Sequence, residues 1–231
     1  MKILKNISLV ILSVIGASIL ILYSIDLKPS FNNEVDFSIK GIDISHHNKI
    51  NNWSNIKNEI GFCYIKSTEG STYIDPNFKT NWLLAKKHNI KRGAYHYFFP
   101  GVPAEKQFNN FKNHVQLSPG DLPPVLDVEL KESNMNEVTK WLELATKYYK
   151  VKPILYTEFI FFKVYMDGKV DNQYPLWIYI DKSFGFKPSF NNYNCVLWQF
   201  SHKGKVDGIT GDVDLDSFLG DSLQFKSMIV K

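Results

Sequence analysis

The sequence predicts an α/β protein, an irregular parallel (β/α) barrel of the TIM type preceded by an N-terminal hydrophobic helix. Strand-like runs alternate with helical runs over six or more units, which is typical of a closed parallel sheet. Several of these strand-like runs end in carboxylic acids, as expected for a site at the mouth of a barrel. An apolar run that follows two lysines near the N-terminus predicts the helix.

Residues 1–25 are predicted to be a signal-anchor helix or a signal peptide. Lys2 and Lys5 precede an uncharged, apolar run over residues 7–25, which is just long enough to span a bilayer. The run ends without a clean small-x-small cleavage site, which favours an uncleaved anchor in the membrane. The lysines would then stay in the cytoplasm and the domain would lie on the extracytoplasmic side. Cleavage would instead give a secreted protein.

Residues 26–37 are predicted to be a linker, because they include Pro29 and show no clear hydrophobic period. Residues 38–231 then form one catalytic domain, and the chain length of 231 residues fits one domain plus an extension.

Strands are expected where β-branched and aromatic residues cluster, and helices where apolar residues recur every three or four positions. The expected strands are 39–45, 62–66, 93–99, 125–130, 154–157, 176–180 and 196–200. One helix is expected to start with Asp75 as N-cap and Pro76 at its first position, and another spans 104–116. A third starts at Asn134, with Glu137 as its capping partner, and residues 182–194 contain no good helix.

Composition excludes several functions. The net charge of +4 suits an anionic target such as a cell wall but is too small to indicate a nucleic-acid partner. Nucleotide-binding glycine motifs are absent. The two cysteines, Cys63 and Cys195, have no metal-ligand spacing and sit in apolar runs, so two buried free thiols are expected rather than a zinc site.

The segment Asp127-Val128-Glu129 is the main candidate for chemistry. Alternate residues of a strand point to one face, so the two carboxylates are expected to project together while Val128 packs inward. Neighbouring carboxylates resist ionising together, which raises the pKa of one of them. Glu129, with the longer side chain, is predicted to keep a proton and donate it to a glycosidic oxygen, while Asp127 stays charged.

Further motifs resemble glycoside hydrolase family 25, the lysozymes of the Chalaropsis type. The resemblance covers Gly41 to about Phe218, and its motifs follow in family order. They are Gly41-Ile42-Asp43-Ile44-Ser45-His46, Tyr64-Ile65-Lys66-Ser67-Thr68-Glu69-Gly70, Asp75-Pro76-x-Phe78-x-x-Asn81, Gly93-Ala94-Tyr95-His96-Tyr97-Phe98, Pro124-Val125-Leu126-Asp127-Val128-Glu129, Leu176-Trp177-Ile178, Trp198-Gln199-Phe200 and Val213-Asp214-Leu215-Asp216.

This resemblance implies hydrolysis of the β-1,4 bond between N-acetylmuramic acid and N-acetylglucosamine in peptidoglycan glycan strands. It implies that Glu129 is the acid and that Asp43, Asp127 and Asp214 are supporting carboxylates. It also implies an irregular barrel and no metal or organic cofactor. A monomer is expected.

Aromatic residues give candidates for sugar stacking. Tyr97, Tyr156 and Trp177 are predicted to lie in the cleft, and Gln199 to hydrogen-bond the substrate. His96 is predicted to be a hydrogen-bonded core residue rather than a base.

Two short pairs have open interpretations. His46-His47 stands where many relatives have His-Trp. As neighbours in a strand, these two residues would point to opposite faces and would not chelate a metal. The change either gives a different surface for sugar stacking or is purely structural. Lys66 and Glu69 form a structural ion pair or line the cleft, and the structural role is favoured.

Two other functions remain open from the sequence. One is a non-catalytic wall-binding module on the same fold, although all four carboxylates are present. The other is a barrel hydrolase of another amino-sugar polymer, such as chitin.

Overall fold

The computed structural model describes residues 39–184 and 193–231 of the chain. The predicted signal segment (1–25) and linker (26–37) lie outside the described residues, as does most of the stretch 182–194. Within the described ranges, no helix combines the length and the apolar character needed to cross a membrane.

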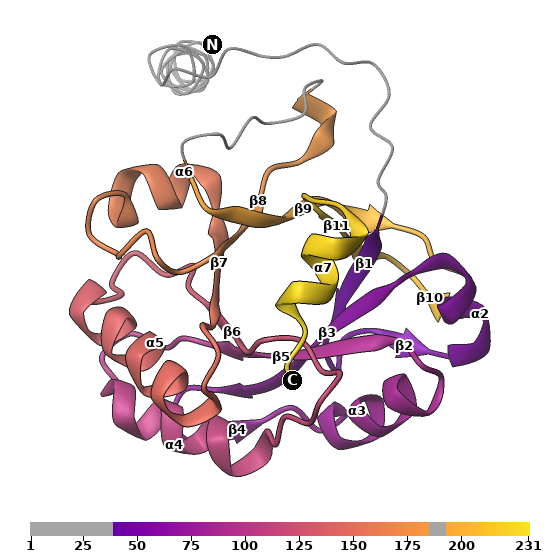
Figure 1. The fold of residues 1–231 in the computed structure, drawn as a ribbon, viewed down its shortest axis with the longest axis horizontal. Coiled ribbons are helices and arrows are strands. Elements are labelled where there is room, and N and C mark those ends of the chain that lie inside the picture. The colour runs from indigo at the N-terminus through magenta and orange to yellow at the C-terminus, as the bar shows by residue number, and fades with distance from the viewer. Residues whose placement is uncertain (1–38, 185–192) are drawn as a thin grey trace, which may run out of the picture. The chain divides into compact units, whose positions relative to one another are not determined.

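Among the described residues, eight strands form a closed barrel, and a barrel is the architecture that the sequence predicted (Figure 1). They are β1 (Lys40–Ile44), β3 (Phe62–Glu69), β5 (Lys91–Tyr97), β6 (Val125–Asp127), β7 (Ile154–Glu158), β8 (Leu176–Tyr179), β9 (Cys195–Gly204) and β11 (Val213–Phe218). Their order is β1-β11-β9-β8-β7-β6-β5-β3, and pairing of β3 with β1 completes the ring. Three short strands lie outside the ring: β4 (Tyr73–Ile74) pairs with β3, and β2 (Lys49–Ile50) pairs with β10 (Ile209–Thr210).

The barrel is mixed, which corrects the prediction of a parallel sheet. β11 runs antiparallel to both of its neighbours, β9 and β1, whereas the other ring pairings are parallel. Between β9 and β11 the chain has only residues 205–212, and these contain no helix. A parallel return needs a crossover of a dozen or more residues, so this short connection reverses the strand direction.

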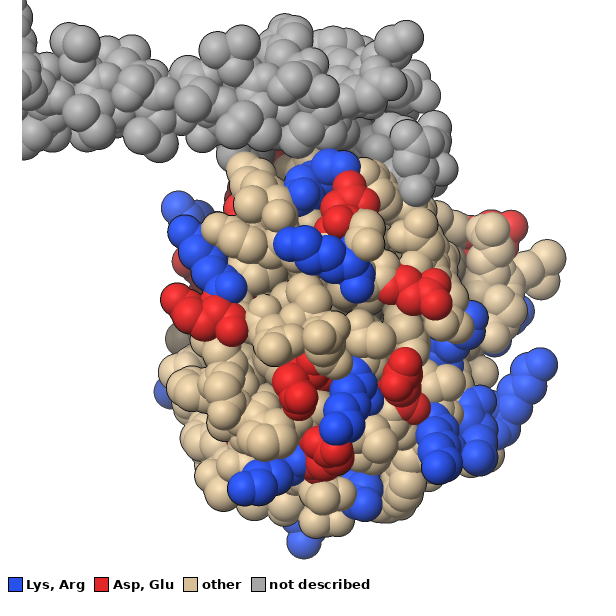
Figure 2. All heavy atoms as spheres, turned by 90° about the vertical axis from the view of Figure 1, so that its left-hand side faces the viewer, with Lys and Arg blue, Asp and Glu red and all other residues tan. Residues whose placement is uncertain are grey.

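Helices cover the outside of the barrel, where α3, α4 and α5 lie against the strands (Figure 1). The helical segments are α2 (Trp53–Glu59), α3 (Phe78–Lys87), α4 (Ala104–His114), α5 (Met135–Tyr149), α6 (Phe159–Phe161), η1 (Phe162–Met166), η2 (Lys182–Phe184) and α7 (Ser222–Met228). On the face shown in Figure 2, basic and acidic side chains are interspersed over most of the surface. Glu105 of α4 and Lys140 of α5 form an exposed ion pair between two of these helices.

α7 packs where the parallel strands begin. Its Phe225 side chain contacts Phe62 at the start of β3 and Phe218 at the end of the antiparallel β11, with ring centroids 5.8 and 5.2 Å apart. Burial of these rings stabilises that end of the barrel. The carboxyl-terminal ends of the parallel strands lie at the other end.

Large aromatic rings pack against glycines inside the barrel. The Tyr64 ring lies over Gly93, where a Cβ atom would be 2.1 Å from a ring carbon of Tyr64. The same ring contacts Trp177 with a centroid distance of 5.0 Å, and Trp177 contacts Tyr156 at 5.0 Å. These rings fill the interior and form the floor beneath the strand ends.

The start of α3 differs from the prediction. The helix begins at Phe78 with Asn77 as N-cap, rather than with Asp75 as N-cap. Asp75 is buried, and its carboxylate accepts hydrogen bonds from the backbone N–H groups of Asn77 and His46 and contacts the His46 ring. One carboxylate oxygen thus bonds to the segment just before α3, while the other ties this segment to His46 beyond the end of β1.

The start of α5 matches the prediction in part. The Asn134 side chain caps the helix by accepting from the backbone N–H of Asn136. Glu137 does not complete the predicted capping box, because its carboxylate accepts from the backbone N–H of Ala104, at the start of α4. The acid therefore ties two neighbouring helices together.

The core predictions are confirmed with one exception. Cys63 and Cys195 are both free thiols, but only Cys63 is fully buried and Cys195 is half-buried. His96 is a buried core residue whose ring nitrogens face the hydroxyl of Thr68 at 2.7 Å and the side-chain oxygen of Gln107 at 3.2 Å. Burial lowers the pKa of His96 to about 3, so the ring is neutral.

Candidate active site

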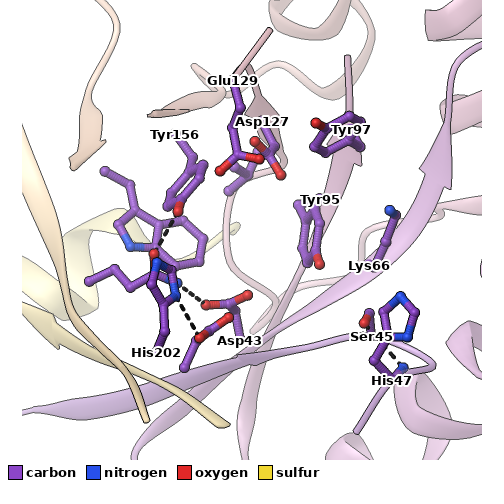
Figure 3. A pocket seen from close by; sticks show the side chains of 14 residues that line it. Asp43, Ser45, His47, Lys66, Tyr95, Tyr97, Asp127, Glu129, Tyr156 and His202 are labelled. Atoms are coloured by element: carbon purple, nitrogen blue, oxygen red, sulfur yellow. Dashed lines mark hydrogen bonds and ion pairs between the residues drawn. The ribbon is translucent and has the colours of Figure 1, made fainter. Parts of the chain in front are cut away.

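A pocket of about 200 Å³ opens at the carboxyl-terminal ends of the parallel strands, where barrel enzymes place their chemistry (Figure 3). Every residue that the sequence suggested for the site lines it: Asp43, Tyr97, Asp127, Glu129, Tyr156, Trp177, Gln199 and Asp214. In Figure 3, Asp127 and Glu129 point into the pocket from one side, while Asp43 points in from the opposite side.

Asp43 and Asp214 face each other across the β1–β11 pairing. Asp43 lies one residue before the end of β1, at the carboxyl-terminal rim. Asp214 lies near the start of its strand, and it reaches the same rim because β11 is antiparallel. The reversal of β11 therefore brings the end of the chain into the site.

Asp127 and Glu129 both face the pocket, although the strand is shorter than predicted. β6 ends at Asp127 rather than at residue 130. Beyond that end, Val128 remains buried and fixed by β7: its N–H donates to the Tyr156 carbonyl at 3.0 Å, and its carbonyl accepts from the Thr157 hydroxyl at 2.7 Å. This anchoring preserves the alternation, with Val128 inward and the acids on either side of it toward the pocket.

Two different environments surround these two acids. Asp127 is 8% exposed, and burial raises the pKa of its carboxyl well above the ordinary value, with a further contribution from the neighbouring Glu129 charge. Glu129 lies at the exposed edge of the pocket, where partial desolvation also raises the pKa of its carboxyl. Burial argues against the prediction that Asp127 is the permanently charged member of the pair. The charge of Lys66 acts in the opposite direction, because it lowers the pKa of both acids.

Asp43 also has a raised pKa. Burial is the main cause, and the charges of Asp214 and Asp216 add to it. A hydrogen bond from the Gln199 amide acts in the opposite direction, with Nε2 2.6 Å from Oδ2 of Asp43. The site therefore concentrates carboxyl groups in a volume where they cannot all ionise at low cost.

Gln199 connects two walls of the pocket. Its side-chain oxygen accepts from the Tyr156 hydroxyl at 2.5 Å, while its amide nitrogen donates to Asp43. With both ends engaged, the amide is held in one orientation. Gln199 and Tyr156 are 2% and 7% exposed, so both are predominantly structural walls with only an edge toward the pocket.

Asp216 is an interior acid that sequence reasoning missed. It is fully buried below Asp214, and one carboxyl oxygen accepts from the Trp177 indole N–H at 3.0 Å. Its Oδ2 atom has no hydrogen-bond partner among the described residues, and burial raises the pKa of its carboxyl well above the ordinary value. Alternation from Asp214 was the available signal. Trp177 is 2% exposed, so it offers only an edge to a sugar ring.

Lys66, Glu69 and Tyr97 form the β3–β5 side of the site. Lys66 is paired with Glu69 at 2.8 Å, and of the two only Lys66 also lines the pocket. Its ammonium lies 4.9 Å from the Tyr97 ring centroid. Desolvation is the main cause of a raised pKa for Tyr97, and the nearby Glu129 charge adds to it. Tyr97 is therefore a neutral neighbour of the proposed acid.

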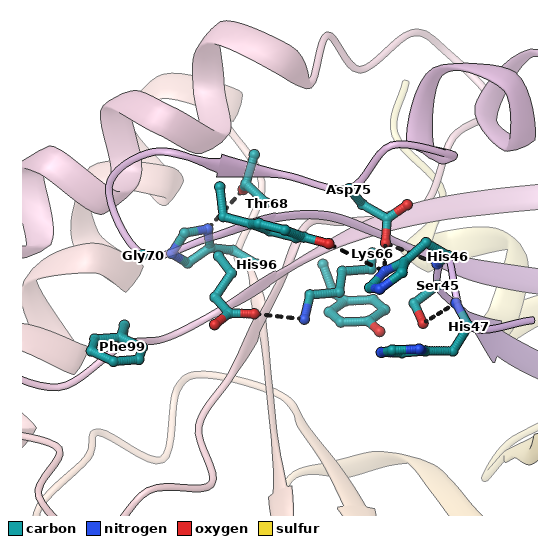
Figure 4. Close-up of polar contacts among 12 residues, drawn as sticks. Ser45, His46, His47, Lys66, Thr68, Gly70, Asp75, His96 and Phe99 are labelled. Carbon is teal, nitrogen blue, oxygen red and sulfur yellow. Dashed lines mark hydrogen bonds and ion pairs between the residues drawn. The ribbon is translucent and has the colours of Figure 1, made fainter.

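His46 and His47 lie in a turn rather than in a strand, so they do not point to opposite faces as predicted (Figure 4). Their ring centroids are 3.8 Å apart. His46 faces the buried Asp75 carboxylate at 2.8 Å, whereas His47 is exposed and lines the pocket. His46 is thus structural, and His47 lies at the pocket rim.

His202, Tyr95 and Ser45 also line the pocket and were not among the predicted site residues. His202 had no usable signal, because its place depends on how β9 pairs with β11. Among the residues that the structure describes, no group of three or more His, Cys, Asp or Glu side chains is arranged to hold a metal ion.

Comparisons with known proteins agree with this geometry. The sequence model of glycosyl hydrolases family 25 matches residues 42–209, a range that includes Asp43, Asp127 and Glu129 and ends before Asp214. A protein called YegX from Escherichia coli O157:H7 is 33% identical over 204 residues, covering 84% of this chain and 74% of its own. Lysozyme M1 of Streptomyces globisporus is 29% identical over 210 residues, covering 82% and 71%.

Solved structures share the barrel. A family 25 glycosyl hydrolase from Bacillus anthracis superposes with a TM-score of 0.76 at 28% identity, covering 86% of this chain and 98% of its own. A bacterial lysozyme from Streptomyces coelicolor gives a TM-score of 0.72 at 26% identity, covering 82% and 96%.

Proposed function

Because the chain belongs to glycosyl hydrolases family 25, we propose that Glu129 is the general acid with which it cleaves the β-1,4 bond between N-acetylmuramic acid and N-acetylglucosamine. The chain is a peptidoglycan-hydrolysing muramidase, similar to proteins that are named lysozyme and N,O-diacetylmuramidase. One observation carries the assignment to Glu129. Of the four carboxyl groups that line the pocket it is the exposed one, and its pKa is raised.

The proposed reaction begins with proton transfer from Glu129 to the glycosidic oxygen as the bond to the anomeric carbon breaks. A carboxyl with a raised pKa keeps its proton nearer to neutral pH and is therefore available as a donor. The acetamido oxygen of the substrate attacks the anomeric carbon and forms a cyclic intermediate. Water then opens this intermediate, with its proton returning to Glu129. Direct attack by water, without the cyclic intermediate, is the alternative.

Asp127 is proposed to orient the acetamido group. Its Oδ1 atom is buried without a hydrogen-bond partner among the described residues, and the residue lines the pocket. An unpartnered buried acceptor is costly, and an N–H group of the substrate would satisfy it. Burial favours the neutral form of Asp127, whereas the positive charge of Lys66 acts in the opposite direction and favours the ionised, accepting form. Asp43 and Asp214 on the opposite side are proposed to stabilise positive charge that develops on the sugar.

The test is release of reducing ends from purified peptidoglycan by the full chain and by Glu129→Gln. The variant is expected to lose at least 100-fold in rate, in line with removal of a general acid. Glu132→Gln is the matched control, because Glu132 is exposed in the same loop and does not line the pocket. Native turnover by Glu129→Gln would refute the assignment. Turnover of chitin, measured in parallel, would indicate a chitinase. Pelleting of the protein with cell walls without release of reducing ends would indicate a non-catalytic wall binder.

We also propose that residues 1–25 anchor the enzyme in the membrane, with the barrel on the extracytoplasmic side. The support is the order of Lys2, Lys5 and the apolar run that follows them. Mass analysis of the mature N-terminus and membrane fractionation distinguish an anchor from a cleaved signal peptide. Size-exclusion chromatography tests the expected monomer.

A further inference from the structure

His202 lines the pocket but has no part in the reaction proposed above. It lies on β9, and its Nδ1 atom is 2.8 Å from Oδ1 of Asp214. The side chains of His202 and Asp214 are 45% and 33% exposed, so this pair lies at the pocket mouth. In Figure 3, the imidazole lies on the side of the pocket opposite Glu129.

An irregularity in the strand pairing places this imidazole. Val213 of β11 is opposite Gly204, and Leu215 is opposite Ser201. β11 advances by two residues from Val213 to Leu215, while the opposite segment of β9 advances by three, from Ser201 to Gly204. β9 therefore has one additional residue in this interval, at His202 and Lys203. Bulges of this kind redirect side chains and are common beside active sites. The bulge aligns His202 with Asp214, the residue between Val213 and Leu215 on β11.

A second contact fixes the plane of the ring. The Tyr179 ring of β8 lies 3.9 Å from the His202 ring, centroid to centroid, with an interplanar angle of 38°. The imidazole is therefore held by an aromatic face from one neighbouring strand and by a carboxylate from the other. These two contacts hold the imidazole ring in one orientation, whereas a surface histidine without such contacts has no fixed orientation.

Acidic groups surround His202 on several elements. Asp214 of β11, Glu129 after β6 and Asp181 after β8 all act on it, and the hydrogen bond with Asp214 is the main reason that the pKa of His202 is raised. Glu129 in turn faces His202 and Lys66, whose charges lower its pKa, and Glu158 and Asp214, whose charges raise it. The largest single charge effect on Glu129 comes from His202.

We propose that His202 is a positioning residue of the muramidase reaction, which fixes the Asp214 side chain at the rim and sets the pH range over which Glu129 keeps its proton. The proposal rests on Glu129 being the acid. As an imidazolium, His202 neutralises Asp214 and places a positive charge across the pocket from Glu129. It acts through these two acids rather than by contact with the sugar.

The first test is the pH dependence of kcat/KM on peptidoglycan for the full chain and two variants. His202→Gln removes the charge, so Glu129 is expected to keep its proton to higher pH and the alkaline limb to move upward by about half a pH unit or more. His202→Lys keeps a positive charge beside Asp214 and is expected to restore the native limb. An unmoved limb in His202→Gln, or a His202→Lys limb that coincides with that of His202→Gln, overturns the proposal.

The matched control is Lys203→Gln. It removes one positive charge from an exposed neighbour on the same strand that does not line the pocket. Its alkaline limb is expected to stay at the native position. A shift equal to that of His202→Gln would mean that the overall charge of the protein, rather than the His202–Asp214 pair, sets the limb.

The second test does not depend on turnover. NMR titration of the His202 ring is expected to give a pKa above the ordinary 6.5 in the native chain, falling toward that value in Asp214→Asn. An unchanged titration in Asp214→Asn refutes the pairing even if His202→Gln fails to fold. Native activity of Glu129→Gln would instead refute the acid assignment while leaving the titration result standing, so the two failures are distinguishable.

Discussion

Asp43 and Asp214 are direct partners across the antiparallel β1–β11 pair, although one lies in the first strand of the barrel and the other in the last. This register places two acids at one rim without a turn or a loop to position them. The consequence is electrostatic: after burial, the Asp214 charge is the largest cause of the raised pKa of Asp43. The protonation of Asp43 therefore depends on the charge of its cross-strand partner.

Replacing Asp214 with Asn is expected to lower the pKa of Asp43. The substitution removes a negative charge from the cross-strand partner, while burial and Asp216 continue to raise that pKa. Carbon-detected NMR titration of the aspartate carboxyls measures the change. Asp212→Asn, in the same segment but exposed and ion-paired with Lys205, is the control and is expected to leave Asp43 unchanged. A pKa of Asp43 that is equal in the native chain and in Asp214→Asn would contradict the coupling.

Gln199→Leu is expected to destabilise the fold and to raise the pKa of Asp43 further. The variant loses the donor to Asp43 and leaves the Tyr156 hydroxyl without its acceptor. Leaving a buried polar group unpaired costs about 1–3 kcal/mol of unfolding free energy, which urea titration measures. Gln116→Leu, at an exposed position, is the control and is expected to stay within about 0.5 kcal/mol of the native value. Equal stability of the two variants would argue against the Tyr156–Gln199–Asp43 chain.

Gly93→Ala is expected to lower the free energy of unfolding by about 1–3 kcal/mol or more, as for overpacked cores. The added Cβ would lie 2.1 Å from a ring carbon of Tyr64, and that ring is itself packed against Trp177. Gly61→Ala is a milder comparison, since its nearest neighbour is 3.2 Å away. Denaturant titration compares both variants with the native chain. If Gly93→Ala were as stable as Gly61→Ala, the rings on the barrel floor would be more adaptable than this packing implies.

Strand-end acids were predictable because their positions follow from alternation. Asp127 and Glu129 flank a residue that packs inward, and Asp43 ends an apolar run, so pattern alone placed them at one rim. Asp216 and His202 were missed for a different reason. Asp216 alternates with Asp214, but its burial inside the barrel depends on the direction of β11, which the pattern does not give. The place of His202 depends on the bulge in β9, which leaves no periodic signal.

Sequence patterns also misplace residues whose partners lie far along the chain. Asp75-Pro76 has the form of a helix start, yet the Asp75 carboxylate is engaged by His46 at the end of β1. Glu137 has the position of a capping-box acid, yet it bonds to the backbone of Ala104. For Glu137 a tertiary hydrogen bond replaces the local one that the pattern predicts. Asp75 keeps a local bond from the Asn77 N–H and adds the tertiary contacts with His46 through its other oxygen.

His96 is expected to make the fold more sensitive to acid. The pKa of His96 is about 3 in the folded chain, against 6.5 for an ordinary histidine, because burial disfavours the charged ring. Between these two values the unfolded chain binds a proton that the folded chain does not. The free energy of unfolding therefore falls as the pH decreases from about 6.5 to about 3, by up to about 1.4 kcal/mol per pH unit.

The comparison of native chain and His96→Phe isolates this contribution. Asp43, Asp127 and Asp216 have raised pKa values and act in the opposite direction, because their folded forms bind protons that the unfolded chain releases as the pH rises. Their contribution is common to both proteins and cancels in the difference. His96→Phe is expected to be less stable at neutral pH, since Thr68 and Gln107 lose a partner, but the difference from the native chain should shrink as the pH falls from 6.5. Urea titration at several pH values measures this difference in the free energy of unfolding. His88→Phe, at a half-buried position, is the control. A difference between the native chain and His96→Phe that is constant with pH would show that His96 is not a neutral buried ring.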